Sequence, residues 1–282
     1  MKYFFSTIIL ALSAVLTGCP LQKTDSGTST VPTTTNSSAS TTSSACTTST
    51  IDQGQKGTAA ATQRGTFSDI AMIPSTSYYA TVYNDPNAIA IKLSYWNGSN
   101  YVIETVSGEG AGTFIKLAFR SDGVPFVFWV SGTRVRGASR SLALTTSDGV
   151  WTGATIDTGV APRALDASVS PNNDILLTFL TGTAATVRGK IAICPGTCAS
   201  ATGFLTMTPN AYVENTNVVT AGFQTGAAWC NAGSGTYYPV AVFPLTAAVR
   251  YVSCLNSAVG CLNSASWSAG NVVAAAGVAA DL

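Results

Sequence analysis

The sequence contains no histidine and few charged side chains. None of the 282 residues is His, and only 10% are Asp, Glu, Lys or Arg, against about 25% in an ordinary soluble domain. The lack of imidazole excludes Ser–His–Asp triads, His general bases and most zinc sites. The 14 basic and 13 acidic side chains give a formal net charge of +1, which is not the basic surface that nucleic-acid binding requires. We therefore expect no nucleic-acid partner, and no motif indicates a cofactor.

The N-terminus has the pattern of an export signal. Lys2 precedes an apolar run, Tyr3–Leu16, which is too short for a membrane-spanning helix. The run ends in Leu-Thr-Gly-Cys, at Leu16–Cys19, and this resembles the lipobox of bacterial lipoproteins. The resemblance implies that residues 1–18 are removed and that Cys19 becomes the N-terminus, carrying a diacylglycerol and an amide-linked acyl chain such as palmitate. A plain secretory signal with an incidental cysteine is the alternative.

A lipid on Cys19 implies a membrane partner, because each buried CH₂ of an acyl chain contributes about 0.8 kcal/mol of anchoring. In enterobacterial lipoproteins an Asp after the lipidated Cys retains the protein at the inner membrane. The resemblance therefore implies that Pro20, which stands there, favours the outer membrane, with the domain facing the periplasm or the cell surface.

From Lys23 to Thr50, 19 of 28 residues are Ser or Thr. We expect residues 19–66 to form a disordered tether, either a solvated spacer or an O-glycosylated stalk.

From Phe67 to Leu282 the sequence predicts an all-β domain made of repeats. Short β-branched and aromatic runs are broken by Gly, Asn, Asp and Pro, and no helical period is sustained. A unit of four strands recurs four times. The expected first strands are Ser68–Ile73, Phe114–Phe119, Leu165–Val169 and Val218–Phe223; the second are Tyr79–Tyr83, Pro125–Trp129, Ile175–Phe179 and Tyr238–Phe243; the third are Ile89–Tyr95, Arg140–Thr145, Gly189–Cys194 and Val249–Cys254; the fourth begin at Tyr101, Trp151, Phe204 and Trp267.

Repeats of four strands over about 40–50 residues are typical of β-propeller blades. A lone four-stranded sheet leaves a face unburied, so blades pack face to face around an axis. We expect the aromatic residue that opens each fourth strand to lie between blades. The residues after Trp267 complete a fourth blade and begin another first strand. Either the ring closes at four or five blades, with the terminal segment pairing near Phe67, or the sequence is truncated. We favour truncation, because about four blades is the lower limit for a propeller.

Two Asp-Gly turns carry a resemblance to a known family. They lie in Arg120–Pro125 and in Thr146–Trp151. The second is similar to a degenerate Asp-box, Ser-x-Asp-x-Gly-x-x-Trp, with Thr146 in the Ser place and shortened spacing. The unit thus resembles the neuraminidase-repeat, or sialidase-like, propellers of exported bacterial proteins. The other two repeats lack the Asp-Gly pair, so the resemblance concerns the architecture and not a catalytic subfamily.

The seven cysteines fit an oxidising compartment. Cys194 and Cys198 lie between the third and fourth strands of one repeat, and Cys254 and Cys261 lie at the matching place in the next. We interpret them as the disulfides Cys194–Cys198 and Cys254–Cys261, in preference to a four-thiolate metal site. Cys46 and Cys230 remain as a further possible pair.

Four aspartates recur at intervals of eight or nine residues: Asp148, Asp157, Asp166 and Asp174. They do not have the spacing of a calcium-binding loop. We interpret them as turn residues and expect no metal site.

Three hypotheses about function follow. The first is a non-catalytic envelope lipoprotein whose propeller is a binding scaffold for a glycan or a protein. The second is a sialidase-like glycoside hydrolase, which by resemblance needs three arginines around a carboxylate, a Tyr–Glu nucleophile pair and an Asp acid/base. No spacing assigns these roles, and we interpret Arg134, Arg136 and Arg140 as a solvated basic edge. The third is an outer-membrane assembly or structural factor. We assign no catalytic residue.

Overall fold

The computed structural model describes residues 67–86, 88–108, 112–159, 161–183, 186–196, 198–207, 224–244 and 249–273. The expected signal at 1–18, the lipid site Cys19, the tether at 19–66 with Cys46, and the expected strand Val218–Phe223 lie outside these residues. So does the segment after Val273. None of the helices within the described ranges has the length and apolar character needed to cross a bilayer.

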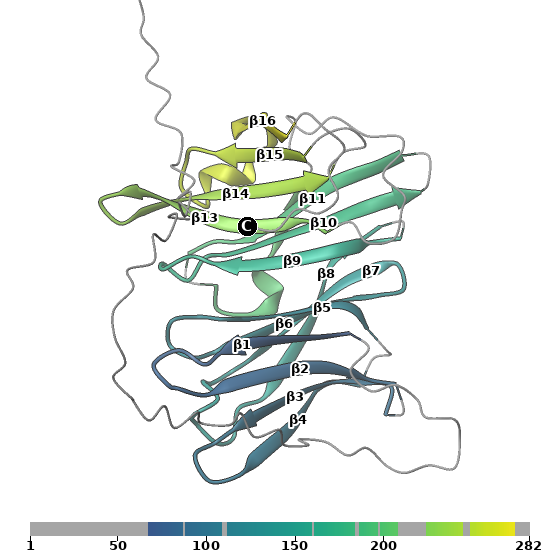
Figure 1. Cartoon of the computed structure of the whole chain (residues 1–282), viewed down its shortest axis with the longest axis vertical. Coiled ribbons are helices and arrows are strands. Elements are labelled where there is room, and N and C mark those ends of the chain that lie inside the picture. Colours follow the sequence, from purple (N-terminus) through teal and green to yellow (C-terminus); the bar gives the residue numbers. More distant parts are fainter. Residues whose placement is uncertain are drawn as a thin grey trace, which may run out of the picture. The chain divides into compact units, whose positions relative to one another are not determined.

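The described residues form four antiparallel sheets, each made of four strands consecutive in the chain (Figure 1). The first sheet contains β1 (Ser68–Met72), β2 (Tyr79–Asp85), β3 (Ala90–Trp96) and β4 (Tyr101–Ser107). The second contains β5 (Thr113–Phe119), β6 (Pro125–Ser131), β7 (Arg134–Arg140) and β8 (Trp151–Thr158). The third contains β9 (Arg163–Val169), β10 (Ile175–Thr183), β11 (Thr186–Cys194) and β12 (Leu205–Met207). The fourth contains β13 (Gly226–Gly233), β14 (Thr236–Pro244), β15 (Val249–Cys254) and β16 (Trp267–Val273).

Short 3₁₀ helices lie between the third and fourth strands of the last two sheets. They are η1 (Ala201–Gly203), η2 (Gly260–Leu262) and η3 (Ser264–Ser266). Ser200 caps η1 because its side chain accepts a hydrogen bond from the Thr202 backbone N–H, and Asn263 caps η3 in the same way through Ala265. Such side-chain acceptors satisfy backbone donors that a short helix leaves free.

Two strands that the sequence analysis predicts lie elsewhere in the structure. The third strand of the second sheet is Arg134–Arg140 and not Arg140–Thr145, because a two-residue turn at Gly132 and Thr133 joins it to β6 and Ser131 pairs with Arg134. The first strand of the fourth sheet is β13, not the segment Val218–Phe223.

The reason for the second error is the turn that joins β13 to β14. Gly233 pairs with Thr236, and the two residues between them, Ser234 and Gly235, both have positive φ. A two-residue hairpin turn of this kind requires the strand to run directly into it. The first strand therefore lies immediately before the turn.

Successive sheets pack face to face. The first strands contact one another in chain order, β1 with β5, β5 with β9 and β9 with β13. Three apolar cores lie between sheets one and two, two and three, and three and four. Their largest buried side chains include Trp129, Phe128, Phe179 and Phe243, and burying a side chain of this kind contributes about 1.5–3 kcal/mol. This is a propeller-like arrangement, and no comparable set of contacts joins β1 to β13 in the described part of the chain.

Polar contacts also connect the first strands. The Asp69 carboxylate on β1 accepts a hydrogen bond from the Leu117 N–H on β5 at 2.8 Å. Asp166 on β9 accepts from the Ala227 N–H on β13 at 2.9 Å, and its other oxygen lies 2.9 Å from the Lys116 ammonium on β5. The same side-chain-to-backbone link thus recurs between sheets, which shows that the repeats superpose in register.

Candidate functional site

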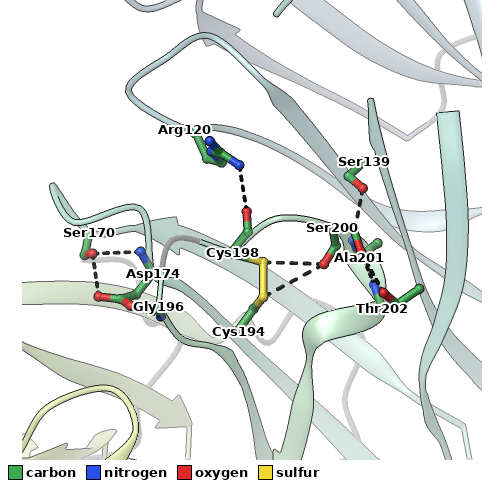
Figure 2. The surroundings of a disulfide bond; sticks show 10 residues. All are labelled: Arg120, Ser139, Ser170, Asp174, Cys194, Gly196, Cys198, Ser200, Ala201 and Thr202. Carbon is green, nitrogen blue, oxygen red and sulfur yellow. Dashed lines mark hydrogen bonds between the residues drawn. A yellow bond between two sulfur atoms is a disulfide. The ribbon is translucent and has the colours of Figure 1, made fainter. Parts of the chain in front are cut away.

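The loop between the third and fourth strands of the third sheet is closed by a disulfide between Cys194 and Cys198. Figure 2 shows how this loop reaches the second sheet: the Arg120 guanidinium donates to the Cys198 carbonyl at 3.0 Å, and the Ala201 N–H donates to the Ser139 hydroxyl at 3.0 Å. The disulfide therefore stiffens a loop that links two sheets.

The fourth sheet has a disulfide between Cys254 and Cys261 at the corresponding place. The Trp267 indole N–H donates to the Cys261 carbonyl at 2.9 Å. Both disulfides are buried, with no cysteine in them more than 2% exposed, so these bonds are structural and not accessible to redox exchange. Cys230 is also disulfide-bonded; Cys46, its expected partner, lies outside the described residues.

The second sheet has a buried arginine where the next two sheets have a disulfide. The last residue of the third strand is Arg140 in the second sheet, Cys194 in the third and Cys254 in the fourth. Arg140 is 3% exposed, which contradicts its interpretation as part of a solvated basic edge. Its guanidinium donates to the carbonyls of Leu142, Ala143 and Thr146.

The loop that resembles an Asp-box therefore wraps around a cation. A side chain at Gly149 would collide with the Arg140 guanidinium, and Asp148 has a φ of 66°. The Asp-Gly pair thus supplies a positive φ followed by a position without a side chain. This explains the motif structurally, because the sharp turn lets three carbonyls converge on one guanidinium.

Glu104 on β4 completes this cluster. One of its carboxylate oxygens accepts from the Arg140 Nε at 3.1 Å and from the Trp151 indole at 2.7 Å. The other accepts from the Tyr95 hydroxyl at 3.0 Å. Burial and the Glu104 carboxylate together raise the pKa of Tyr95 to about 12.

The Tyr95–Glu104 contact is the kind of pair that the hydrolase hypothesis needs for its nucleophile. An adjacent general base such as Glu104 can activate a phenol, but Tyr95 is only 6% exposed and lies in the core between the first two sheets. Two of the three donors to Glu104, the Arg140 guanidinium and the Trp151 indole, come from the second sheet, whereas Tyr95 lies in the same sheet as Glu104. The cluster therefore connects the first two sheets.

The four regularly spaced aspartates have separate roles. Asp148 and Asp174 lie in turns or loops, as expected. Asp157 and Asp166 lie on β8 and β9, which contradicts their interpretation as turn residues; Asp157 binds the Lys190 ammonium through both oxygens, at 2.9 and 2.8 Å. Within the described ranges no three acidic or sulfur side chains gather as a metal site.

Three of the four aromatics that open the fourth strands lie between sheets. Trp151, Phe204 and Trp267 each contribute to a core shared with the preceding sheet. Tyr101, in the first sheet, is 43% exposed. It lies on the face of the first sheet that points away from the second, because it pairs with Trp96, and the adjacent pair, Tyr95 with Val102, packs in the core shared with the second sheet.

This exposed face has a definite composition, and we call it the aromatic face. Across the four strands, one row consists of Met72, Tyr79, Trp96 and Tyr101, and the next consists of Ile70, Thr81, Ser94 and Ile103. The Trp96 and Tyr101 rings meet edge to face, with centroids 5.1 Å apart. Both rows flank a hollow of about 480 Å³, which Tyr78 and Ser77 also line.

Tyr78 is held at the hollow by the turn between β1 and β2. The Thr76 hydroxyl donates to the Ile73 carbonyl at 2.8 Å and accepts from the Tyr78 N–H at 3.1 Å. The Ile73 N–H in turn donates to the Tyr78 carbonyl at 2.9 Å. These short local bonds order the loop independently of any ligand.

Two hydroxyl residues occupy the centre of the aromatic face. The directly opposed pair on the second and third strands is Thr81 with Ser94 in the first sheet, Val127 with Ala138 in the second, Leu177 with Ala192 in the third, and Ala241 with Val252 in the fourth. Ser94 is only 2% exposed, and its hydroxyl oxygen has no hydrogen-bond partner in the described structure.

Sequence reasoning identified Tyr101 as a repeat position but missed the aromatic face. The available signal was the contrast between repeats: Thr81 and Ser94 interrupt a pair that is apolar in the other three. That contrast becomes visible only after the strands are aligned in register, and the misplaced third and first strands prevented this alignment.

Comparisons with known proteins give little further information. No family model matches the chain, and no curated protein does. Among solved structures, an α-L-arabinofuranosidase from Lactobacillus brevis is similar with a TM-score of 0.40 and 12% sequence identity, over 71% of this chain and 70% of that one. The function is therefore argued from the residues of this chain.

Proposed function

We propose that this protein is a non-catalytic binding scaffold of the bacterial envelope, and that the aromatic face is where it binds. The observation that carries this proposal is the exposure of Ile70, Met72, Tyr79, Tyr101 and Ile103 on one sheet face. Contiguous exposed apolar surface on a folded domain marks an interaction site. The equivalent faces of the other three sheets are covered, each by the sheet that precedes it in the chain.

The proposed setting comes from the sequence. Cys19 after Leu-Thr-Gly is the proposed lipid site, and the Ser/Thr-rich residues 19–66 are the proposed tether. A flexible chain of this length has a root-mean-square span of roughly 35–40 Å, which is enough to hold a domain away from lipid headgroups. We further propose that the four sheets are consecutive blades of a β-propeller related to sialidase-like repeats, which their order and face-to-face packing support.

The anchor is tested by metabolic labelling with an alkyne analogue of palmitate in a bacterial host. The wild-type chain should incorporate the label and fractionate with outer membranes. Cys19→Ser should lose both properties, and Cys230→Ser serves as the control that keeps Cys19. Unlabelled wild-type protein would contradict the lipid assignment but leave the binding face untouched.

The binding role is tested by placing a photo-reactive phenylalanine analogue at Tyr79, with Tyr251 as the matched control. Both tyrosines are exposed, at 58% and 39%, but only Tyr79 lies on the aromatic face. Irradiated envelopes should give adducts from position 79 and not from 251. A defined protein adduct would favour the assembly-factor hypothesis, and equal labelling at both positions would contradict the binding face. Sustained glycoside turnover by the purified wild-type chain would overturn the non-catalytic assignment.

A further inference from the structure

We propose that the ligand of the aromatic face is a neutral oligosaccharide, with sugar rings stacked on Tyr79, Trp96 and Tyr101 and a sugar hydroxyl bonded to Ser94. This inference rests on the proposed function and specifies its ligand. Tyr79 and Tyr101 are exposed, and Trp96 is half-buried. Trp96 pairs with Tyr101, and the register that pairs Ala80 with Tyr95 places Tyr79 next to Trp96 at the end of the ladder.

The lining of the hollow matches the chemistry of a neutral sugar. It consists of aromatic, hydroxyl and aliphatic side chains, without Asp, Glu, Lys or Arg. A pyranose ring has an apolar C–H face, which packs on the electron-rich face of an aromatic ring, and a polar edge of hydroxyls. Its volume of about 480 Å³ lies within the range of small-molecule sites, about 300–1,000 Å³. The next row on this face carries Lys92, whose ammonium is already paired with Asp85 at 2.8 Å, so an anionic glycan would have to compete with that carboxylate.

Ser94 supplies an independent indication that a polar ligand binds. A buried hydroxyl without a partner is destabilising, and native proteins rarely keep one. Ser94 Oγ is such a group in the described structure, and Ser94 belongs to the lining of the hollow. A ligand hydroxyl placed over the face would give Ser94 its missing partner, with Thr81 directly opposite on β2.

The same residues argue against another β-sheet as the occupant. Where a sheet covers this position, the opposed pair is apolar: Val127 with Ala138, Leu177 with Ala192, and Ala241 with Val252. Another sheet packed on the first one would bury Thr81 and Ser94 in a dry interface, and an unsatisfied hydroxyl is costly there. A hydroxyl-rich ligand instead suits hydroxyl residues.

The test uses the purified mature chain and a panel of neutral hexasaccharides, namely cello-, malto-, manno- and chitohexaose, with a sialylated hexasaccharide as the anionic comparison. Binding is measured by isothermal titration calorimetry and by the change in intrinsic tryptophan fluorescence, which Trp96→Ala should remove. At least one neutral chain should bind, and the anionic chain should bind at least ten-fold more weakly. Trp96→Ala and Tyr79→Ala should each weaken binding by roughly ten-fold or more, whereas Tyr251→Ala should leave it unchanged.

Ser94→Ala separates a ligand contact from a structural role. It should weaken the oligosaccharide about three- to ten-fold, the loss expected for one hydrogen bond, while the free protein melts at the same or a higher temperature. A merely structural Ser94 would lose stability and binding together, which would overturn the assignment of this contact.

Other outcomes contradict the inference in distinguishable ways. No binding of any neutral chain, or binding that the face variants do not change, overturns the oligosaccharide but leaves the scaffold proposal to the photo-crosslinking experiment. Concentration-dependent dimers that Thr81→Lys disrupts would identify a second copy of the chain as the occupant. A protein adduct from position 79 without oligosaccharide binding would identify a protein ligand and also overturn the inference.

Discussion

The aromatic face of the first sheet and the covered faces of the next three sheets occupy the same position in the repeat but differ in chemistry. The covered faces place Val127, Leu177 and Ala241 at the position of Thr81. At the end of the third strand they place Arg140, Cys194 and Cys254, where the first sheet has Trp96. The covered faces thus carry groups that hold sheets together, and the exposed face carries groups suited to a ligand. The chemistry of a sheet face in this protein therefore follows whether another sheet covers it.

The largest expected effect is at Arg140, on the covered side of the comparison. Arg140→Ala should lower the free energy of unfolding by about 3–5 kcal/mol, because it leaves the partly buried Glu104 carboxylate without its cation. Trp96→Ala, at the matching position of the exposed face, should cost less than half as much. Urea unfolding monitored by circular dichroism measures both. Equal decreases in the free energy of unfolding of the two variants would contradict this difference, because they would mean that both positions stabilise the fold to the same extent.

The second prediction exchanges residues between the two kinds of face. Leu177→Thr places a hydroxyl in a dry core and should cost about 2–4 kcal/mol. Thr81→Val is the reverse change on the aromatic face and should alter stability by no more than about 0.5 kcal/mol. The free energies of unfolding of both variants provide the measurement. A large loss for Thr81→Val would show that the aromatic face is packed as tightly as the covered ones.

The third prediction concerns the covalent link on the covered side. The double variant Cys194→Ser, Cys198→Ser should lower the free energy of unfolding by about 2 kcal/mol, since the loop that the disulfide closes is short. Differential scanning calorimetry with and without reductant measures the change. Because the disulfide lies between the second and third sheets, ligand binding at the aromatic face should not change. A loss of binding in the folded variant would contradict the independence of the two regions.

The smallest effect near neutral pH is expected from the titration of Tyr95, which packs in the core shared with the second sheet. Its pKa of about 12 lies above the ordinary value of 10.0, so the folded state favours the neutral phenol. This contribution to stability is fully present below pH 10 and is lost as the pH rises from about 10 to 12. Ultraviolet titration of tyrosinate absorbance should show one late-titrating group that Tyr95→Phe removes. Tyr79→Phe, the same change at an exposed tyrosine of the aromatic face, should leave the late-titrating group in place.

Much of the fold could be predicted from the sequence, because it depends on local patterns. Alternating apolar residues and turn residues identified most of the strands, and the matched spacing of Cys194, Cys198, Cys254 and Cys261 indicated the two loops that the structure closes with disulfides. The pattern failed where a turn was overlooked: Gly132 and Thr133 form a hairpin that moves the third strand of the second sheet. It also failed at Arg140, because a charged residue can be buried when a distant partner is present.

The sequence by itself determined the all-β class and the four-strand repeat, because both follow from patterns among neighbouring residues. The export signal and the lipid anchor are predictions from the same kind of local pattern. Only the tertiary structure decided which faces are covered. Glu104 and Arg140 belong to different sheets, as do Asp69 and Leu117. The exposure of Tyr79 and Tyr101 and the unpaired hydroxyl of Ser94 likewise depend on whether another sheet lies against them. Burial is a property of the packed assembly of sheets, and no single strand encodes it.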